Sequence, residues 1–275
     1  MNKSSETSVL ICSKNSEDSI KNTLEQIFKN KPKEIILIDG CSDDKTLEIA
    51  KIFTDKIFSD DGKGLGYARQ LGVSKVKSKY LVIISPDDII SDNFISAATE
   101  ELKNCDENVV ALLAPKRLKL IETFCDYGQD AIYKLQQKFK LRTVGNPSIY
   151  KTEYLVKYQF DETFSANEDT DLCERWFHDN LQTKWGKSFF TYEAETKSWV
   201  EFKKRYIWYG EGDYNFFKKW IKINKKTAVR HLFHPLITYG LKYTFFFILK
   251  LDFKAALFSI CCCTFRYIGF IRKIK

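Results

Sequence analysis

The chain has 275 residues, of which 44% are hydrophobic, and its formal net charge is +8. This length is enough to bury a full core and predicts one large domain with an appendage rather than several full domains. The eight cysteines form no CxxC pair, and the first residues, MNKSSETSVL, lack the apolar core of a signal peptide. We therefore expect a reducing, cytoplasmic setting, which argues against a disulfide-stabilised secreted domain.

Charge divides the chain into two unlike parts. Residues 1–201 carry 28 Lys and Arg against 33 Asp and Glu, whereas residues 202–275 carry 16 against 3. Aromatic rings such as Trp208, Trp220 and Phe245 alternate with the cations of the tail. Single-stranded nucleic acid binds to similar mixtures, but the last 45 residues are too apolar for that role, so the headgroup layer of an anionic membrane is favoured. We expect a catalytic domain over 1–201 and a membrane-associated tail over 202–275.

The tail predicts helices that lie on a membrane. Its aromatic stretch 202–220 has helical character that Gly210 and Gly212 are expected to break. The two apolar runs that follow, 232–249 and 255–271, are borderline for crossing a hydrocarbon core, which takes about 20 residues. Helices in the interface, or a shallow hairpin, fit better than two full spans.

Short apolar runs alternate with amphipathic stretches through the first part of the chain. Residues 9–12, 34–39, 80–85 and 109–114 are predicted as buried strands, and the apolar spacing in 20–28 and 47–53 predicts helices between them. This alternation indicates an α/β fold with a mostly parallel, Rossmann-like sheet flanked by helices. In such sheets ligands bind at the carboxyl ends of the strands. Residues 116–145 are less regular, and we expect a helical excursion over that edge.

Two acidic clusters lie where such a site is expected. The sequence Ser85-Pro86-Asp87-Asp88 ends a buried strand, and Asn167-Glu168-Asp169-Thr170-Asp171 opens the helix-like stretch 172–178. A metal-bound phosphate and an acceptor hydroxyl that loses its proton both need carboxylates of this kind. Asp39, also at a strand end, can accept a hydrogen bond from the edge of a uracil ring. A plain loop or capping role is the alternative for Asp39.

The order of these pieces resembles the family 2 glycosyltransferases of the GT-A fold, which invert the anomeric carbon. The resemblance runs through most of residues 8–212. It is carried by VLICSKNSE at 9–17, ILIDGCSDDKT at 36–46, GKGLGYARQLG at 62–72, the two acidic clusters, and RYIWYGEG at 205–212. The glycine-rich piece does not read as a dinucleotide-binding motif, because the third glycine of GxGxxG is absent.

The resemblance implies a role for each matching position. Asp169 is implied as the catalytic base and Glu168 as the group that orients hydroxyls, while Mg²⁺ or Mn²⁺ is implied at Asp87 and Asp88. The residues implied to bind the nucleotide sugar are Asn15, Glu17, Asp39, Ser42, Gly64, Arg69, Ser85 and Asp87. The chain departs from the family at Ser85, which stands where the D-x-D motif has its first acid. A role at a helix N-terminus is an open alternative for Ser42, for Asp88, and for the pair Glu168 and Asp169.

The expected reaction is transfer of one sugar from a nucleotide-diphosphate sugar, with UDP favoured and GDP possible, to a lipid-linked or glycan acceptor at the cytoplasmic membrane face. No nucleic acid beyond the donor nucleotide is expected as a partner. The Q-x-x-R-W signature of polysaccharide synthases is absent at its spacing, which favours single transfer. A nucleotide-sugar or glycan-binding protein with lapsed catalysis is the alternative, prompted by Ser85. A sugar-1-phosphate nucleotidyltransferase is disfavoured, because CSKNSE stands where its glycine-rich loop would be.

Overall fold

The computed structural model describes residues 6–193 and 198–275. The chain forms two compact units, which we call the sheet unit, Met1–Arg117 with Lys140–Ala194, and the helical unit, Leu118–Phe139 with Glu195–Lys275. The helical unit therefore contains the expected tail together with residues 118–139. That segment joins it because Cys125, Ile132 and Leu135 are buried in the same apolar core as Phe202 and Phe258.

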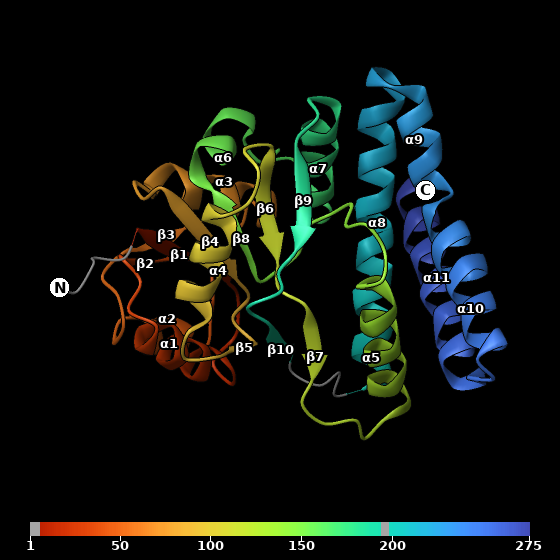
Figure 1. The fold of residues 1–275 in the computed structure, drawn as a ribbon, viewed down its shortest axis with the longest axis horizontal. Coiled ribbons are helices and arrows are strands. Elements are labelled where there is room, and N and C mark those ends of the chain that lie inside the picture. The colour runs from red at the N-terminus through yellow and green to blue at the C-terminus, as the bar shows by residue number, and fades with distance from the viewer. Residues whose placement is uncertain (1–5, 194–197) are drawn as a thin grey trace. The chain divides into compact units, whose positions relative to one another are not determined.

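The sheet unit contains a seven-stranded sheet in the order β3-β2-β1-β4-β8-β6-β9 (Figure 1). Parallel pairing joins β1 to β2 and β4, β2 to β3, and β6 to β9, whereas β8 runs antiparallel to β4 and β6. The mostly parallel α/β sheet is confirmed. The strands are β1 Thr7–Ser13, β2 Ile35–Asp39, β3 Ile57–Ser59, β4 Tyr80–Ile84, β6 Val109–Leu113, β8 Ser148–Lys151 and β9 Gln182–Trp185.

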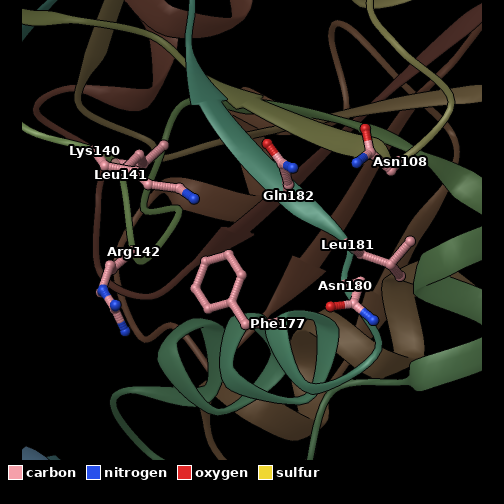
Figure 2. Close-up of a pocket in the computed structure, with 8 residues that line it drawn as sticks. All are labelled: Asn108, Lys140, Leu141, Arg142, Phe177, Asn180, Leu181 and Gln182. Atoms are coloured by element: carbon pink, nitrogen blue, oxygen red, sulfur yellow. The ribbon is translucent and has the colours of Figure 1, made fainter.

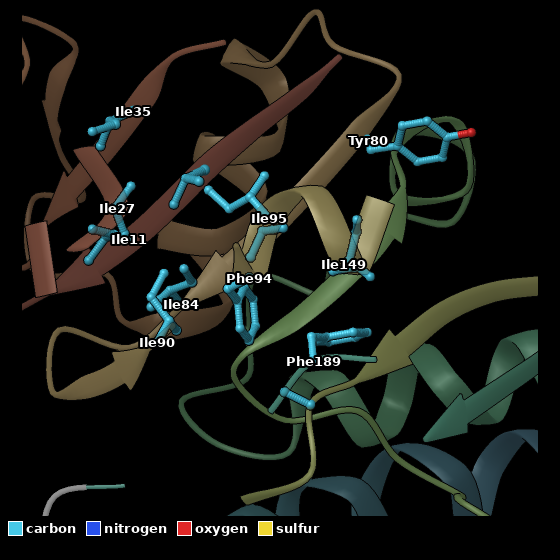
Figure 3. Close-up of a cluster of buried hydrophobic side chains, with 14 of the residues drawn as sticks. Ile11, Ile27, Ile35, Tyr80, Ile84, Ile90, Phe94, Ile95, Ile149 and Phe189 are labelled. Carbon is cyan, nitrogen blue, oxygen red and sulfur yellow. The ribbon is translucent and has the colours of Figure 1, made fainter. Parts of the chain in front are cut away.

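Both faces of this sheet are covered, which is why its strands read as continuous apolar runs. Alternate side chains enter different cores: Val9 and Ile11 pack with helices α1 and α4, whereas Leu10 packs with α3 and α7. Figure 3 shows the first core, where the rings of Phe94 and Phe189 meet edge to face at 5.1 Å. The helices are α1 Ile20–Lys29, α2 Thr46–Ala50, α3 Leu65–Lys75, α4 Phe94–Lys103, α6 Thr152–Tyr158 and α7 Glu168–His178.

A smaller three-stranded sheet has the order β5-β10-β7. Its strands are β5 Asp88–Ile90, β10 Thr191–Glu193 and β7 Lys116–Leu118. Strand β5 begins at the last residue of the acidic Ser85–Asp88 turn and pairs antiparallel with β10. The second half of that turn is therefore fixed by sheet pairing.

The helical unit consists of α5 Phe124–Gln136, α8 Trp199–Ile223, α9 Lys225–Leu232, the π-helix η1 Pro235–Tyr243, α10 Thr244–Leu249 and α11 Phe253–Ile274. The prediction that Gly210 and Gly212 break this stretch is wrong, because α8 is continuous through both; at Gly210 the helix lies close to α11. A Cβ on Gly210 would lie 1.9 Å from the backbone oxygen of Arg266, and one on Gly269 would lie 1.9 Å from that of Ile207. Only glycine fits at either position. Nearby, Asp213 forms a buried ion pair with Arg266 and lies in hydrogen-bond contact, at 2.9 Å, with Nε2 of His231.

Large apolar side chains remain exposed along the hairpin of η1, α10 and α11, whose helices pack against one another. An 18-residue stretch within the 22-residue helix α11 has a mean hydropathy of 1.4, so the helix is long and apolar enough to cross a membrane, although half of that stretch is buried within the structure. Helix α9 with η1 and α10 passes the same test as a pair bent by 44°. The exposed apolar residues of this hairpin and its flanks include Phe233, Leu236, Ile237, Leu241, Phe245, Ile248, Leu249, Leu251, Phe253, Leu257 and Ile260.

Candidate active site

The loops after β1 and β2 are connected through Ser42. Its amide and hydroxyl donate hydrogen bonds of 2.9 and 2.6 Å to the carboxylate of Asp39, which is buried at the end of β2. The Ser42 hydroxyl also accepts from the amide of Asn15 at 2.9 Å, and the Asn15 side chain accepts from the amide of Asp43 at 3.1 Å. Three of the residues predicted to bind the nucleotide thus form one rigid platform. Each Asp39 oxygen keeps a lone pair for a base edge.

Glu17 and Asp44 hold the start of α2 next to this platform. Glu17 accepts from the amide of Lys45 at 3.0 Å, and its own amide donates to Asp44 at 3.0 Å. Asp44 also accepts from the amide of Thr46 at 2.9 Å. The carboxylate of Glu17 is exposed, so it can still contact a ligand while it satisfies a helix-terminal amide.

The Ser85–Asp88 turn gives its two carboxylates different surroundings. Asp88 is buried, accepts from the Ser85 amide at 2.9 Å, and has its Oδ1 3.9 Å from the ammonium of Lys116. Asp87 is half-buried, and its carboxylate has no hydrogen bond or ion pair within the described ranges. Asp88 therefore holds the turn, and Asp87 is the carboxylate that a ligand finds open.

A metal shared with a diphosphate suits this donor set. In residues 6–193 and 198–275 no three His, Cys, Asp or Glu side chains gather around a possible metal position, so the protein offers no complete cage. Mg²⁺ is commonly held by one or two carboxylates together with substrate phosphates. The open oxygens of Asp87 fit such a role, and Mg²⁺ or Mn²⁺ would take its remaining ligands from the donor and water.

Glu168 and Asp169 begin α7, directly after Asn167, which adopts the left-handed conformation with φ 63°. Glu168 is 2% exposed and forms an ion pair with Arg69, which is 4% exposed. Asp169 accepts from the amide of Thr170 at 2.6 Å. Burial raises the pKa of Glu168 to about 7, although Arg69 opposes the rise; Asp169 contributes further to it. Burial also raises the pKa of Asp169, again against Arg69.

Arg69 reaches α7 because α3 packs against the loop that precedes α7. The amide of Gly66 donates to the carbonyl of Phe164 at 2.9 Å, and a Cβ on Gly66 would lie 2.4 Å from the carbonyl oxygen of Asp161. Gln70 accepts from the amide of Phe160 at 2.9 Å. The close approach that Gly66 permits is therefore to this loop. Gly64, with φ +99° and open space around its Cα, keeps its backbone accessible.

Residues 143–146 link the two acidic clusters. The hydroxyls of Thr143 and Thr170 lie 3.0 Å apart, and the Asn146 side chain donates to the Ser85 hydroxyl at 3.1 Å. Three residue steps span at most about 11 Å, so the first turn of α7 and the Ser85–Asp88 turn lie on one small region of the sheet edge. Thr143 and Thr170 were not identified from the sequence as linking residues, because isolated hydroxyls give no pattern.

A cavity of about 300 Å³ lies at the other end of α7 (Figure 2). Phe177, Leu181, Gln182 and Asn108 are among the residues that line it, and none of the predicted site residues does. The 11 residues of α7 extend for about 16 Å, which separates this cavity from Asp169.

A family model described as Glycosyl transferase family 2 matches residues 8–143. The chain belongs to this family. The glycosyltransferase is 33% identical over 112 residues to a cholesterol galactosyltransferase of Borreliella burgdorferi, covering 38% of this chain and 31% of that one. It is 28% identical over 99 residues to glycosyltransferase GlyG of Streptococcus pneumoniae, covering 34% of this chain and 32% of that one. The chain thus spans about a third of each relative.

Solved structures show that the glycosyltransferase has the GT-A fold. The mannosyltransferase PcManGT of Pyrobaculum calidifontis, in complex with GDP-Man and Mn²⁺, matches with a TM-score of 0.64 and 12% identity over 96% of this chain and 87% of that one. Glucosyl-3-phosphoglycerate synthase of Mycobacterium tuberculosis, with Mg²⁺ and UDP, matches with a TM-score of 0.57 and 13% identity over 77% and 78%. At such identities the likeness concerns the fold.

Proposed function

We propose that this glycosyltransferase moves one sugar, with inversion, from a nucleotide-diphosphate sugar to a lipid-linked or glycan acceptor at the cytoplasmic membrane face. The observation that carries the proposal is the link through residues 143–146. This link holds Glu168 and Asp169, whose pKa values are raised, near the turn that presents the open carboxylate of Asp87.

The platform of Asp39, Ser42 and Asn15 binds the donor base, with Glu17 at its exposed margin. Because the two loops are hydrogen-bonded to each other, the platform is preorganised, and little entropy is lost when a nucleotide binds. The backbone at Gly64 approaches the diphosphate. A UDP-sugar is favoured, and a GDP-sugar is the second candidate, since each nucleotide accompanies one of the similar structures.

Asp87 would hold a Mg²⁺ or Mn²⁺ ion bound with the donor diphosphate, and Asp88 keeps the turn in shape. The bound ion would neutralise the charge that develops on the departing nucleoside diphosphate. Ser85 replaces the first acid of the motif, and its hydroxyl accepts a hydrogen bond from Asn146. We assign this hydroxyl to the donor ribose or sugar rather than to the ion.

Asp169 takes the proton from the acceptor hydroxyl as that oxygen attacks the anomeric carbon from the face opposite the nucleotide. A carboxylate with an ordinary pKa is a weak base near neutral pH, so the upward shift at Asp169 favours this role. Glu168 orients hydroxyls with the oxygen that Arg69 leaves open.

Membrane association is supported by the helical unit. Its exposed apolar hairpin residues lie in a segment with 16 Lys and Arg against 3 Asp and Glu, a combination that favours an anionic bilayer. The Borreliella relative is named for transfer to cholesterol, which adds weight to a lipid acceptor. A binding protein with lapsed catalysis remains the second candidate, because Ser85 removes one carboxylate.

A donor screen tests the proposal. The purified protein is incubated with a panel of UDP- and GDP-sugars, with Mn²⁺, Mg²⁺ or EDTA, and release of the nucleoside diphosphate is measured with and without a membrane lipid extract. We expect release from one donor class, lost in EDTA and accelerated by the extract. Donor binding by thermal shift without any release would favour the binding protein, and neither binding nor release would contradict both candidates.

A further inference from the structure

Arg69 is a charged side chain enclosed by the sheet unit. It is 4% exposed, and its ion-pair partner Glu168 is 2% exposed. A buried charge is costly unless it is paired, and removing one partner leaves the other uncompensated. We propose that Arg69 is a positioning residue. It fixes Glu168 and, through Glu168, the proposed base Asp169, and it does not bind the donor diphosphate. The inference rests on the proposed function.

The surroundings of Arg69 hold it in place. The guanidinium lies 5.7 Å from the ring of Phe160, whose amide is bound by Gln70 one residue after Arg69. Gly66, one turn earlier in α3, is locked against the carbonyls of Asp161 and Phe164. The segment that resembles a donor-binding loop therefore holds α3 against the loop that precedes α7.

The pairing leaves one polar atom available for a substrate. Arg69 engages Oε1 of Glu168, while Oε2 of Glu168 is buried without a hydrogen-bond partner in the described part of the chain. Buried polar atoms are normally satisfied, so this oxygen is placed to bind a ligand hydroxyl or ordered water. Glu168 would then hold the acceptor with one oxygen and Arg69 with the other.

The charge on the acidic pair depends on Arg69. Burial raises the pKa of Cys12 to about 12 and raises that of Tyr150 and of Cys173, so all three are neutral around pH 7. Arg69 from α3 acts on both Glu168 and Asp169 at the start of α7, and the charge of Asp169 acts on Glu168. Cys12 from β1 and Tyr150 from β8 also face Arg69. Asp60, from the loop before α3, acts on Cys12, and Glu174 and Arg175 of α7 act on Cys173 rather than on the acidic pair. Arg69 lowers the pKa of both acids. Without it, the pair keeps its proton to a higher pH.

The test compares Arg69→Gln with Arg69→Lys and with a matched control, Arg175→Gln. Arg175 forms an ion pair with Asp171, 3.0 Å away on the same helix, but lies outside the proposed site. The titration of Glu168 is followed by carboxyl-carbon NMR on the full chain with labelled glutamate, assigned through Glu168→Gln. Donor turnover is measured as a function of pH for the same proteins.

In Arg69→Gln, we expect the titration midpoint of Glu168 and the acidic limb of the kcat–pH profile to shift to higher pH by at least about one unit. A neighbouring opposite charge has effects of this size. Arg69→Lys should restore most of the shift, Arg175→Gln should show none, and donor KM should change less than about threefold. If Arg69→Gln does not fold, the double variant with Glu168→Gln, which removes both buried charges, should recover thermal stability.

Other results would overturn the inference. An unchanged Glu168 titration in Arg69→Gln, or stability losses that simply add in the double variant, would show that the two side chains are not coupled. A rise in donor KM of more than about tenfold, with an unchanged acidic limb, would make Arg69 a diphosphate ligand. Failure of the wild type to act on any donor would refute the proposed function, whereas the NMR titration would still decide the role of Arg69.

Discussion

Asn146 donates a hydrogen bond of 3.1 Å to the hydroxyl of Ser85, and three residues earlier Thr143 lies in hydrogen-bond contact with Thr170. One short segment thereby joins the turn that presents Asp87 to the helix that presents Asp169. These two carboxylates are far apart in the sequence, and inverting transfer requires them on opposite sides of one sugar. The segment sets the distance between the two halves of the proposed site.

Replacing the proposed base should abolish transfer and leave donor binding intact. Asp169→Asn removes the proton acceptor but keeps the hydrogen-bonding shape, so we expect kcat to fall by about 10²- to 10⁴-fold. Thermal shift with the donor should change little. Glu162→Gln, an exposed acid in the preceding loop, is the control. A loss of less than about tenfold in Asp169→Asn would assign the base elsewhere.

In the Ser85–Asp88 turn, replacing Asp87 should affect the metal dependence of turnover, whereas replacing Asp88 should affect stability. Asp87→Asn should weaken the Mn²⁺ or Mg²⁺ dependence of turnover without a change in melting temperature, because this carboxylate makes no contact in the described structure. Asp88→Asn should destabilise the protein by about 1 to 3 kcal/mol, because a buried acceptor and its ion pair are disturbed. Metal titrations and urea unfolding measure the two effects. The reverse pattern would make Asp88 the ligand.

The pKa of Glu168 predicts a pH dependence of stability. With a pKa of about 7 in the native state and an ordinary value of 4.5 when unfolded, the native state binds more protons between these pH values. Stability should therefore fall as pH rises from 4.5 to 7, by on the order of 3 kcal/mol. Urea unfolding at pH 5 and 7.5 measures the difference, which should be smaller in Glu168→Gln. Equal slopes in both proteins would show that Glu168 titrates normally.

Glycine at position 210 should be required for the packing of the helical unit. Gly210→Ala places a methyl group 1.9 Å from the backbone oxygen of Arg266, and neither helix can yield by a side-chain rotation. We expect destabilisation of at least about 3 kcal/mol, the upper end of overpacking effects. Gly145→Ala, where a Cβ meets nothing within 4 Å, is the control in calorimetry. Equal melting temperatures would contradict the close helix contact.

Exposed apolar residues of the hairpin should determine membrane binding. Ile237→Ser with Phe245→Ser removes two side chains that are 53% and 63% exposed, and flotation with anionic vesicles should drop severalfold. Val156→Ser, 54% exposed in the sheet unit, is the matched control. Binding of the wild type should weaken with salt and on neutral vesicles. Equal flotation of all three proteins would show that another surface binds the membrane.

Strands β1, β2, β4 and β6 and the mostly parallel sheet were predictable from residues 9–12, 34–39, 80–85 and 109–114, because a strand buried on both faces must be apolar throughout. The other strands were not predicted. The helical nature of the tail followed from similar patterns. Two features were not predictable. Residues 118–139 belong to the helical unit, and Gly210 lies within an unbroken helix, because both depend on side chains and backbone more than 50 residues away.

The sequence by itself determined the fold and the family and predicted which carboxylates form the site, because apolar periodicity and the order of short polar motifs are local properties. Tertiary structure alone decided how those carboxylates differ. Asp88 is satisfied by Ser85 and Lys116 whereas Asp87 is open, and Arg69 is buried in an ion pair with Glu168. The physical reason is that burial, pairing and pKa depend on which distant residues share a space, and that is set only when the chain folds.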